Sequence, residues 1–361
     1  MALQDPCMKN ININSQNYFL ACYAVSLIQG ETILGVNLRS TTVLNYVKSA
    51  CKLFKDNDLP SPRKADINYI DTVINALRNF EKVPDRRNMI TDQMIHWMYA
   101  YVKTLPQDAP ESATFDWLLL GRYAGFRKSE WCQSTQSDFD RIEEWPGMPP
   151  YGFILSDFEF FMKFEQSFQR TDTMTIDKVY SVRLRWRKQK NKDNGQIISF
   201  NCDLKHPDFC PVRAAFRIYQ RAVRLQANAD EPIAVCRNKA NTKTIFITDS
   251  LTTKFLRKAA MGAHNISPAS SDLNRWSTHS IRVTAANLLH RAKFSDSFIQ
   301  TRLRWKSTAF LQYLRNTFYS AEAHSKAIGI SENNFPPVQD RSYRALEPHE
   351  ACILQSAAPA A

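Results

Sequence analysis

Residues 278–292 read THSIRVTAANLLHRA, and this stretch has the period of an amphipathic helix. Its apolar residues recur every three or four positions and predict one buried stripe, made of Ile281, Ala285, Leu288 and Leu289. His279 and Arg282 are three residues apart, so they share a face in the first turn. A helix N-terminus binds a phosphate through its unsatisfied N–H groups and its positive dipole end, and the forked Arg cation suits a phosphate as well. The pattern indicates a phosphate site, with a capping His beside an ordinary surface Arg as the alternative.

A further helix is expected over 307–319, within the stretch LRWKSTAFLQYLR at 303–315. A helical wheel gives this helix a buried stripe of three residues with a fourth at its edge, namely Leu311, Leu314 and Phe318, and Phe310. Tyr313 flanks the stripe, so its hydroxyl can point into an adjacent cleft. A tyrosine whose ring covers the boundary of the core is the alternative interpretation.

Residues 118–131 read LLLGRYAGFRKSEW and predict an apolar helix that ends at Gly125. Arg127 follows in the turn, and Glu130 stands three residues later, where its carboxylate can orient the guanidinium group. The alternative is a surface ion pair that contributes less than about 1 kcal/mol.

Residues 178–192 hold seven basic residues and no acidic residue. The side chains from 180 to 188 alternate, which predicts a strand with one apolar face (Val182, Leu184, Trp186) and one basic face (Arg183, Arg185, Arg187). Asp193-Asn194-Gly195 predicts a tight turn, and residues 196–200 predict a second strand. A charge run of this kind is a DNA-binding candidate, although most such runs are solvated surfaces.

Composition supports an intracellular globular protein that attracts a polyanion. The 361 residues include 47 Lys and Arg against 35 Asp and Glu, a net charge of +12, and residues 113–335 alone hold 33 basic and 21 acidic residues. Apolar residues make up 44%, enough to bury a core. No window approaches the roughly 18 uncharged apolar residues of a membrane span, and we expect no secretory signal. Eight cysteines without a Cys-x-x-Cys pair favour reduced thiols.

The pattern of helices and turns predicts two domains. Residues 1–104 read as a bundle of four or five helices, residues 105–112 with their prolines as a linker, 113–335 as a mixed α/β domain, and 336–361 as a flexible tail. The expected helices are 15–29, 91–103, 211–226, 250–262, 278–292 and 295–304, with further helical periodicity over 43–50 and 67–77. The sequence has nine glycines and no Gly-x-Gly-x-x-Gly or Walker loop, so a nucleotide-cradling loop is poorly supported.

Each motif is weak alone, but their order resembles the tyrosine recombinase (phage-integrase) family: Arg, a basic hairpin, His-x-x-Arg, Trp, then Tyr. The amino-acid sequences of the motifs are most similar to those in recombinases of eukaryotic mobile elements of the Crypton and DIRS kind. The resemblance covers residues 113–320 by motif. It implies a mainly α fold with a small β-sheet, in which a helical core-binding domain precedes a mixed α/β catalytic domain.

The resemblance also implies roles for individual residues. Arg127 and Arg282 would clamp the scissile phosphate, with Glu130 as the brace of Arg127, and Tyr313 would be the nucleophile. His279 would assist proton transfer, and Trp305 would pack and hydrogen-bond at the phosphate. The general acid would be a hairpin Lys, for which Lys188, Lys190 and Lys192 compete; Lys190 is chosen because it lies next to the turn. Further DNA contacts are expected from the basic residues Arg183, Arg185, Arg187, Lys188, Lys192, Arg304 and Lys306.

The implied reaction is site-specific cleavage and rejoining of double-stranded DNA through a 3′-phosphotyrosyl intermediate, by a homo-oligomer, dimer to tetramer, on paired sites. The family pattern implies no cofactor, no metal and no membrane, and its eukaryotic members imply the nucleus. The chain departs from the family in two places: the interval between Arg127 and His279 is long, which indicates insertions near 133–178 and 226–245, and Arg304 stands where many members have Gly.

Other interpretations remain open. A type IB topoisomerase uses similar residues without pairing sites, and a DNA-binding protein can retain the fold without activity. Cys202, His206 and Cys210 are spaced like zinc ligands but lack an evident fourth ligand. An acidic group could suggest a two-metal nuclease but has no His partner in sequence: Asp138, Asp140, Glu143, Glu144, Asp157 and Glu159.

Overall fold

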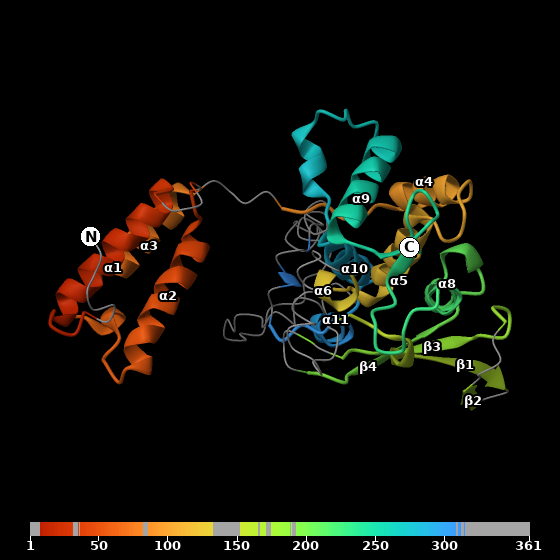
Figure 1. Cartoon of the computed structure of the whole chain (residues 1–361), viewed down its shortest axis with the longest axis horizontal. Helices are drawn as coiled ribbons and strands as arrows, with labels where there is room; N and C mark the ends of the chain where they lie inside the picture. Colours follow the sequence, from red (N-terminus) through yellow and green to blue (C-terminus); the bar gives the residue numbers. More distant parts are fainter. Residues whose placement is uncertain are drawn as a thin grey trace, which may run out of the picture. The chain divides into compact units, whose positions relative to one another are not determined.

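The computed structural model describes residues 8–31, 35, 37–81, 86–132, 152–164, 167–170, 175–187, 189, 193–307, 310–311 and 314. The chain divides into two compact units, Met1–Asp85 and Arg86–Ala361, which are described separately (Figure 1). The described part is mainly helical with a small antiparallel sheet, which confirms the fold class expected from the sequence.

The described helices of the first unit are α1 (Ile13–Gln29), α2 (Ser40–Asp56) and α3 (Tyr69–Phe80), with a short 3₁₀ turn at Pro62–Lys64. Its core includes Val43, Val47, Ile70 and Ile74 of the two periodic stretches, together with Phe54. Asn17 is buried beside them, where its Nδ2 donates to Pro62 O at 2.9 Å and its Oδ1 accepts from Ile70 N at 3.3 Å. This amide fixes α1 against the start of α3.

The second unit is built around α5 (Pro110–Ala124), which is buried on nearly every face. Proline occupies its first turn, where no N–H is needed, and Gly125 ends it with a φ of 59°. Four helices pack against α5, namely α4 (Asp92–Val102), α8 (Pro211–Arg224), α9 (Asp249–His264) and α10 (Ser280–Arg291). Two shorter helices follow α5 and α10, namely α6 (Lys128–Trp131) and α11 (Asp296–Leu303).

The four-stranded sheet of the second unit is antiparallel, with the order β2-β1-β3-β4 (Figure 1). Its strands are β1 (Phe158–Phe164), β2 (Ser167–Arg170), β3 (Ser181–Arg185) and β4 (Ile197–Asn201), and a separate pair joins β5 (Val235–Arg237) to β6 (Thr244–Phe246). The predicted alternation of β3 is confirmed: Val182 and Leu184 are buried, whereas Arg183 and Arg185 are exposed. The sequence did not predict β1, β2, β5 or β6, which lie largely within the two expected insertions.

The boundary between the units differs from the predicted one. The division falls after Asp85 rather than near residue 104, because Met94, Ile95 and Met98 of α4 are buried against α5 and α9. The expected linker at 105–112 is also wrong, because its last residues open α5 and Asp108 forms ion pairs with arginines of α8.

The four arginines of α8 form a stripe whose partners are aspartates of other segments. Each pairing lies within the second unit: Arg213 with Asp177, Arg217 and Arg221 with Asp116, and Arg224 with Asp108. The stripe therefore attaches α8 to α5 and to the segment before it. Within the described residues, none of the helices has the length and apolar character that crossing a bilayer requires.

Candidate active site

Arg127 lies at the entrance to α6, directly after the turn that ends α5. Its backbone N–H donates to Glu130 Oε2 and its Nη1 donates to Glu130 Oε1, both at 2.9 Å. The predicted bracing contact between these two residues is thus present. The Arg127 side chain keeps 19% of its surface exposed, which leaves it within reach of a ligand.

Glu130 is the centre of a buried network rather than the partner of one arginine. Besides Arg127, its carboxylate accepts a hydrogen bond from Trp186 Nε1 at 3.2 Å and from Arg304 Nη2 at 2.8 Å. Trp186 directly follows β3, and Arg304 directly follows α11. One carboxylate therefore joins α6 to the basic strand and to the segment that leads toward Trp305.

Arg282 extends from the first turn of α10 toward the end of α5. Its Nη1 donates to Gly125 O at 2.9 Å, and its Cζ lies 4.1 Å from the centre of the Trp305 ring, a cation–π contact. The space at Gly125 is tight, because a Cβ there would lie 2.9 Å from a methyl carbon of Leu303, which would have to shift. Arg127, Arg282 and Trp305 are therefore gathered around the turn at 125–127.

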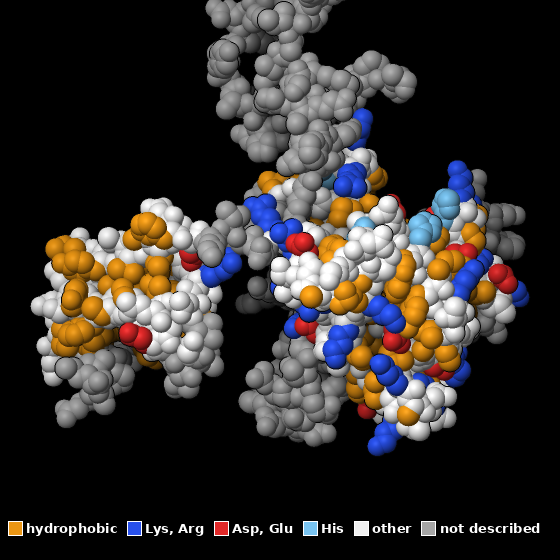
Figure 2. All heavy atoms as spheres, turned by 90° about the horizontal axis from the view of Figure 1, so that it is seen from above, with side chains coloured by type: hydrophobic (Ala, Val, Ile, Leu, Met, Phe, Trp, Pro, Cys, Tyr) orange, Lys and Arg blue, Asp and Glu red, His pale blue; other side chains and the backbone are white. Residues whose placement is uncertain are grey.

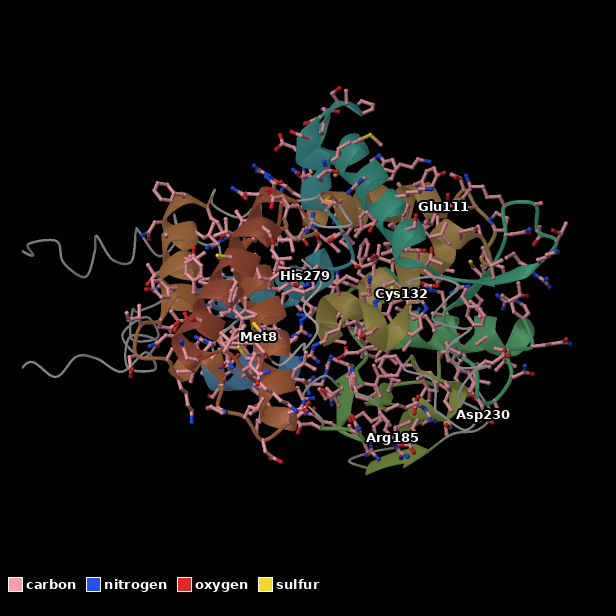
Figure 3. All side chains as sticks on the ribbon, turned by 60° about the vertical axis from the view of Figure 1, so that its left-hand side comes forward. Met8, Glu111, Cys132, Arg185, Asp230 and His279 are labelled. Carbon is pink, nitrogen blue, oxygen red and sulfur yellow. The ribbon has the colours of Figure 1, made fainter. Side chains whose placement is uncertain are left out.

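His279 lies at the start of α10 and is half-buried (Figure 3). The residue before it, Thr278, donates its hydroxyl to Asp249 Oδ1 at 2.7 Å, while Lys128 Nζ lies 3.3 Å from Asp249 Oδ2. Asp249, in the first turn of α9, therefore connects the segment that carries His279 to the segment that carries Arg127. Asp249 and the role of Trp186 were not predicted from the sequence; only the alternation of residues 182–186 gave a signal for the tryptophan.

Arg304 was expected to contact DNA, and the structure contradicts this expectation. Its side chain is fully buried, donates to Ala124 O at 3.0 Å and to Glu130, and stacks 3.9 Å from the centre of the Trp186 ring. Its φ of 58° lies in the left-handed region, which explains why glycine suits this position in the family that the sequence resembles. Burial lowers the pKa of the Arg304 guanidinium to about 10.

The other predicted DNA-contacting residues differ in their surroundings. Arg183 and Arg185 project from β3 and remain about half exposed near Glu159, and Figure 3 marks Arg185 at the end of this strand. Arg187 donates Nε to the buried Asp157 at 2.7 Å, so that arginine also stabilises the sheet. Lys306 is exposed and pairs with Asp193 Oδ1 at 2.8 Å, which connects the turn after Trp186 to the segment after α11.

Several predicted residues lie outside the described part of the chain: Tyr313, Lys188, Lys190, Lys192 and the tail 336–361. Near Tyr313 the structure describes Phe310, Leu311 and Leu314. Phe310 is fully buried beside Leu303, and Leu311 is exposed. The expectation that Leu311 lies in the buried stripe and Phe310 only at its edge is therefore wrong. The Phe310 ring packs edge-on against Trp305, with 6.3 Å between the ring centres.

The zinc and nuclease alternatives receive little support. Cys202 Sγ and Cys210 Sγ are 3.3 Å apart, but within the described ranges no three His, Cys, Asp or Glu side chains are grouped to hold a metal. Of the acidic residues, Asp157 and Glu159 pair with arginines of the hairpin, and 138–144 fall outside the description.

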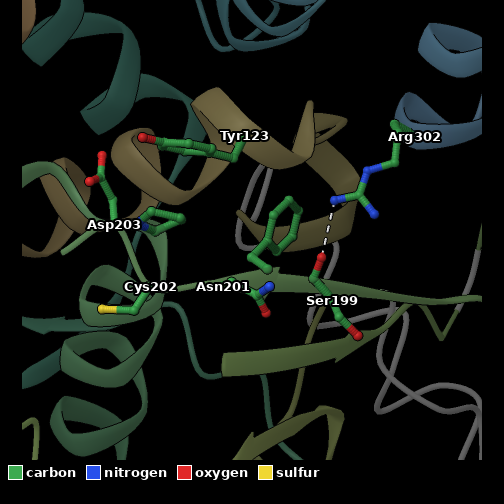
Figure 4. Close-up of a pocket in the computed structure, with 8 residues that line it drawn as sticks. Tyr123, Ser199, Asn201, Cys202, Asp203 and Arg302 are labelled. Carbon is green, nitrogen blue, oxygen red and sulfur yellow. Dashed lines mark hydrogen bonds between the residues drawn. The ribbon is translucent and has the colours of Figure 1, made fainter. Parts of the chain in front are cut away.

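A separate pocket of about 400 Å³ lies between the sheet and α11 (Figure 4). Arg302 donates to Ser199 O at 3.0 Å across it, and Tyr123 and Cys202 contribute to its walls. None of Arg127, Glu130, His279, Arg282 or Trp305 lines this pocket. We therefore place the candidate site at the turn around 125–127.

Comparison with models of protein families finds no match, and comparison with curated proteins finds none either. Among solved structures, the integrase of transposon Tn1549 in complex with transposon right end DNA is similar, with a TM-score of 0.47 and 12% identity over 87% of this chain and 85% of that one. A lambda integrase dimer bound to a COC′ core site gives a TM-score of 0.43 and 13% identity over 93% and 87% of the two chains. At these values the likeness assigns no function, which has to rest on the site itself.

Proposed function

We propose that this chain is a tyrosine recombinase, which cleaves and rejoins DNA strands through a 3′-phosphotyrosyl intermediate. One observation supports the proposal most directly. The segments that carry Arg127, Arg282 and Trp305 come together although Arg127 is more than 150 residues from the other two: Arg127 donates to Arg304 O, Arg282 donates to Gly125 O, and Trp305 stacks on Arg282. His279 shares the first turn of α10 with Arg282.

The chemistry of these groups suits attack on a phosphodiester. The phosphate gains negative charge on its non-bridging oxygens in the transition state, and preorganised guanidinium and ring N–H groups stabilise that charge. A tyrosine hydroxyl has an ordinary pKa of about 10, so Tyr313 would need such cations nearby to act at neutral pH. A lysine of the hairpin, for which we retain Lys190, would protonate the leaving 5′ oxygen.

Double-stranded DNA is the proposed partner. The first unit carries 9 basic and 8 acidic residues and the second carries 38 and 27, so the excess positive charge belongs to the unit that holds the site. Blue Lys and Arg side chains are spread over the face of the second unit seen in Figure 2. We further propose that copies of the chain pair two DNA sites as a dimer or tetramer, and that the first unit helps to enclose the duplex.

A nicked suicide substrate tests the proposal. A duplex built from the junctions that flank the gene is incubated with the full chain, and a covalent protein–DNA adduct is measured on denaturing gels. The adduct should form with wild type and be absent with Tyr313→Phe, while Tyr319→Phe serves as the matched control. An adduct that persists in Tyr313→Phe and disappears in Tyr319→Phe would show that we have named the wrong nucleophile.

Two further variants test the phosphate clamp. Arg127→Lys and Arg282→Lys keep the charge but lose the planar fork, so each should slow adduct formation by about 10²-fold. Relaxation of a supercoiled plasmid that lacks any paired site would instead indicate a type IB topoisomerase. DNA binding without cleavage on every junction would indicate a DNA-binding protein that has lost activity.

We also propose that the enzyme derives from a eukaryotic mobile element of the Crypton or DIRS kind and acts in the nucleus. The support is the amino-acid sequence of the motifs at 125–131, 279–292 and 303–316. Short direct or inverted repeats that flank the gene, and nuclear fluorescence of a tagged chain, are the expected observations. Cytoplasmic retention of the tagged chain would contradict the nuclear assignment.

A further inference from the structure

Arg304 combines three features that are unusual for an arginine. Its backbone has a φ of 58°, a conformation that favours glycine, and its side chain has no exposed surface. Burial also lowers the pKa of the guanidinium group to about 10, although it stays charged at neutral pH. A strained and desolvated cation persists where the surrounding structure uses it, so its contacts indicate its role.

The contacts of Arg304 join three segments at one point. Nη1 donates to Ala124 O at the end of α5, Nη2 donates to Glu130 of α6, and Cζ stacks on the Trp186 ring at the exit of β3. Trp186 and Arg304 also share an acceptor, because both donate to Glu130 Oε2. The carbonyl of Arg304 completes the arrangement by accepting from Arg127 Nη2 at 3.4 Å.

We propose that Arg304 is a positioning residue, which acts through Glu130 to hold Arg127 and the Trp186 end of the basic hairpin in one fixed arrangement. This inference rests on the proposed function, because the arrangement matters for the phosphate that Arg127 would bind. The residue does not contact DNA itself, since its side chain is buried.

Charge gives Arg304 a second effect on the same site. An exclusive Arg127–Glu130 pair would compensate most of the positive charge of Arg127. Here one carboxylate accepts from two guanidinium groups, so its negative charge is divided between them. Arg127 therefore presents more positive charge to a phosphate than it would in a pair of its own.

The proposal is tested with Arg304→Gly and the matched control Arg302→Lys. Glycine adopts the left-handed backbone without strain, so Arg304→Gly removes the guanidinium while keeping the turn. We expect the single-turnover rate of adduct formation to fall by about 10²-fold in Arg304→Gly. DNA affinity should change less than about twofold, because the buried side chain contributes no phosphate contact. Arg302→Lys should keep the wild-type rate.

Chemical rescue separates positioning from general support of the fold. Guanidinium chloride at tens of millimolar should raise the rate of adduct formation by Arg304→Gly about tenfold, because guanidinium can occupy the space between Glu130 and Trp186. Urea has a similar shape but no charge, so it should restore nothing. Recovery with urea, a rate equal to wild type, or a loss of DNA affinity that matches the loss of rate would each overturn the proposal.

A readout without DNA keeps the two proposals apart. The indole N–H resonance of Trp186, assigned among the seven tryptophans by Trp186→Phe, reports its hydrogen bond to Glu130. It should shift in Arg304→Gly and return with guanidinium. If wild type forms no adduct, the proposed function fails while this resonance still tests the positioning role; an unshifted resonance in Arg304→Gly overturns the positioning role alone.

Discussion

Replacing Asp116 by asparagine should destabilise the second unit more than any other removal of a single charge in the α5–α8 interface. The Asp116 carboxylate, with 4% of its side chain exposed, accepts from Arg217 Nε and Arg221 Nη2, each at 2.6 Å. Arg221 is equally enclosed, with 3% exposed, and its Nε donates to Gln107 O at 3.1 Å. The asparagine amide in Asp116→Asn would keep one acceptor oxygen but leave a buried guanidinium group without its closest carboxylate.

The expected magnitude follows from that burial. Breaking a buried ion pair by removing one partner costs about 3–5 kcal/mol, because the remaining charge is left in a poorly polarisable environment. A unit of this size loses roughly 2–4 °C in melting temperature for each kcal/mol, so we expect a decrease of about 10 °C. The total stability of a domain is only about 5–15 kcal/mol, so the change should also lower the yield of folded protein.

The matched control is Asp108→Asn in the same interface. Asp108 is itself 23% exposed, its close partner Arg224 is 45% exposed, and its contact with the buried Arg221 is long, at 3.7 Å. Its loss should therefore cost clearly less than the loss of Asp116, about 1 kcal/mol. Urea unfolding followed by tryptophan fluorescence measures both variants, and the transition of the second unit is compared. Equal losses in Asp116→Asn and Asp108→Asn would refute the reasoning that burial, rather than the number of ion pairs, determines the cost.

Three further predictions concern the turn, the sheet and DNA binding. Gly125→Ala should cost about 2–4 kcal/mol in urea unfolding, because its φ of 59° disfavours a side chain and the new methyl group would meet a leucine of α11; a smaller loss than in Gly195→Ala, where no atom lies within 4 Å, would contradict this. Burial raises the pKa of Asp157, so the native state holds its proton to higher pH than the unfolded chain, and the contribution of this group falls as pH rises through the range above the ordinary aspartate pKa of about 4. Asp157→Asn should therefore gain stability relative to wild type over that range, and a constant difference between the two proteins would refute the assignment. DNA affinity of the full chain should fall about 10³-fold between 50 and 200 mM salt in a binding titration, whereas a flat response would exclude phosphate contacts as its source.

The parts of the site that the sequence predicted are those that depend on local spacing. Glu130 stands three residues after Arg127, and a short turn is enough to bring the two together. The alternation of residues 182–186 likewise reports directly which side chains of a strand face the core. His279 and Arg282 share a helical turn for the same reason.

The errors concern contacts between segments that are distant in the sequence. Helix α4 has an apolar face like those of the first unit, and its period cannot tell which core that face joins. The charge of Arg304 suggests that its side chain lies on the surface, and only its contacts with Glu130 and Trp186 show that it is buried. Strand β1 reads FEFFMKF, an apolar run whose period does not separate strand from buried helix.

Two places in the second unit share the same arrangement, in which one buried carboxylate accepts from two guanidinium groups. On α8, Arg221 and Arg217 share the buried Asp116; Arg221 is enclosed, and Arg217 keeps 29% of its side chain exposed. Near α6, Arg304 and Arg127 share Glu130; Arg304 is fully enclosed, and Arg127 keeps 19% exposed. In each place the enclosed arginine and the carboxylate fix the orientation of a partly exposed cation, and the one near α6 lies at the candidate site. A phosphate that approaches the turn at 125–127 meets a guanidinium group whose orientation is set before binding, so little of the interaction energy is lost in ordering it.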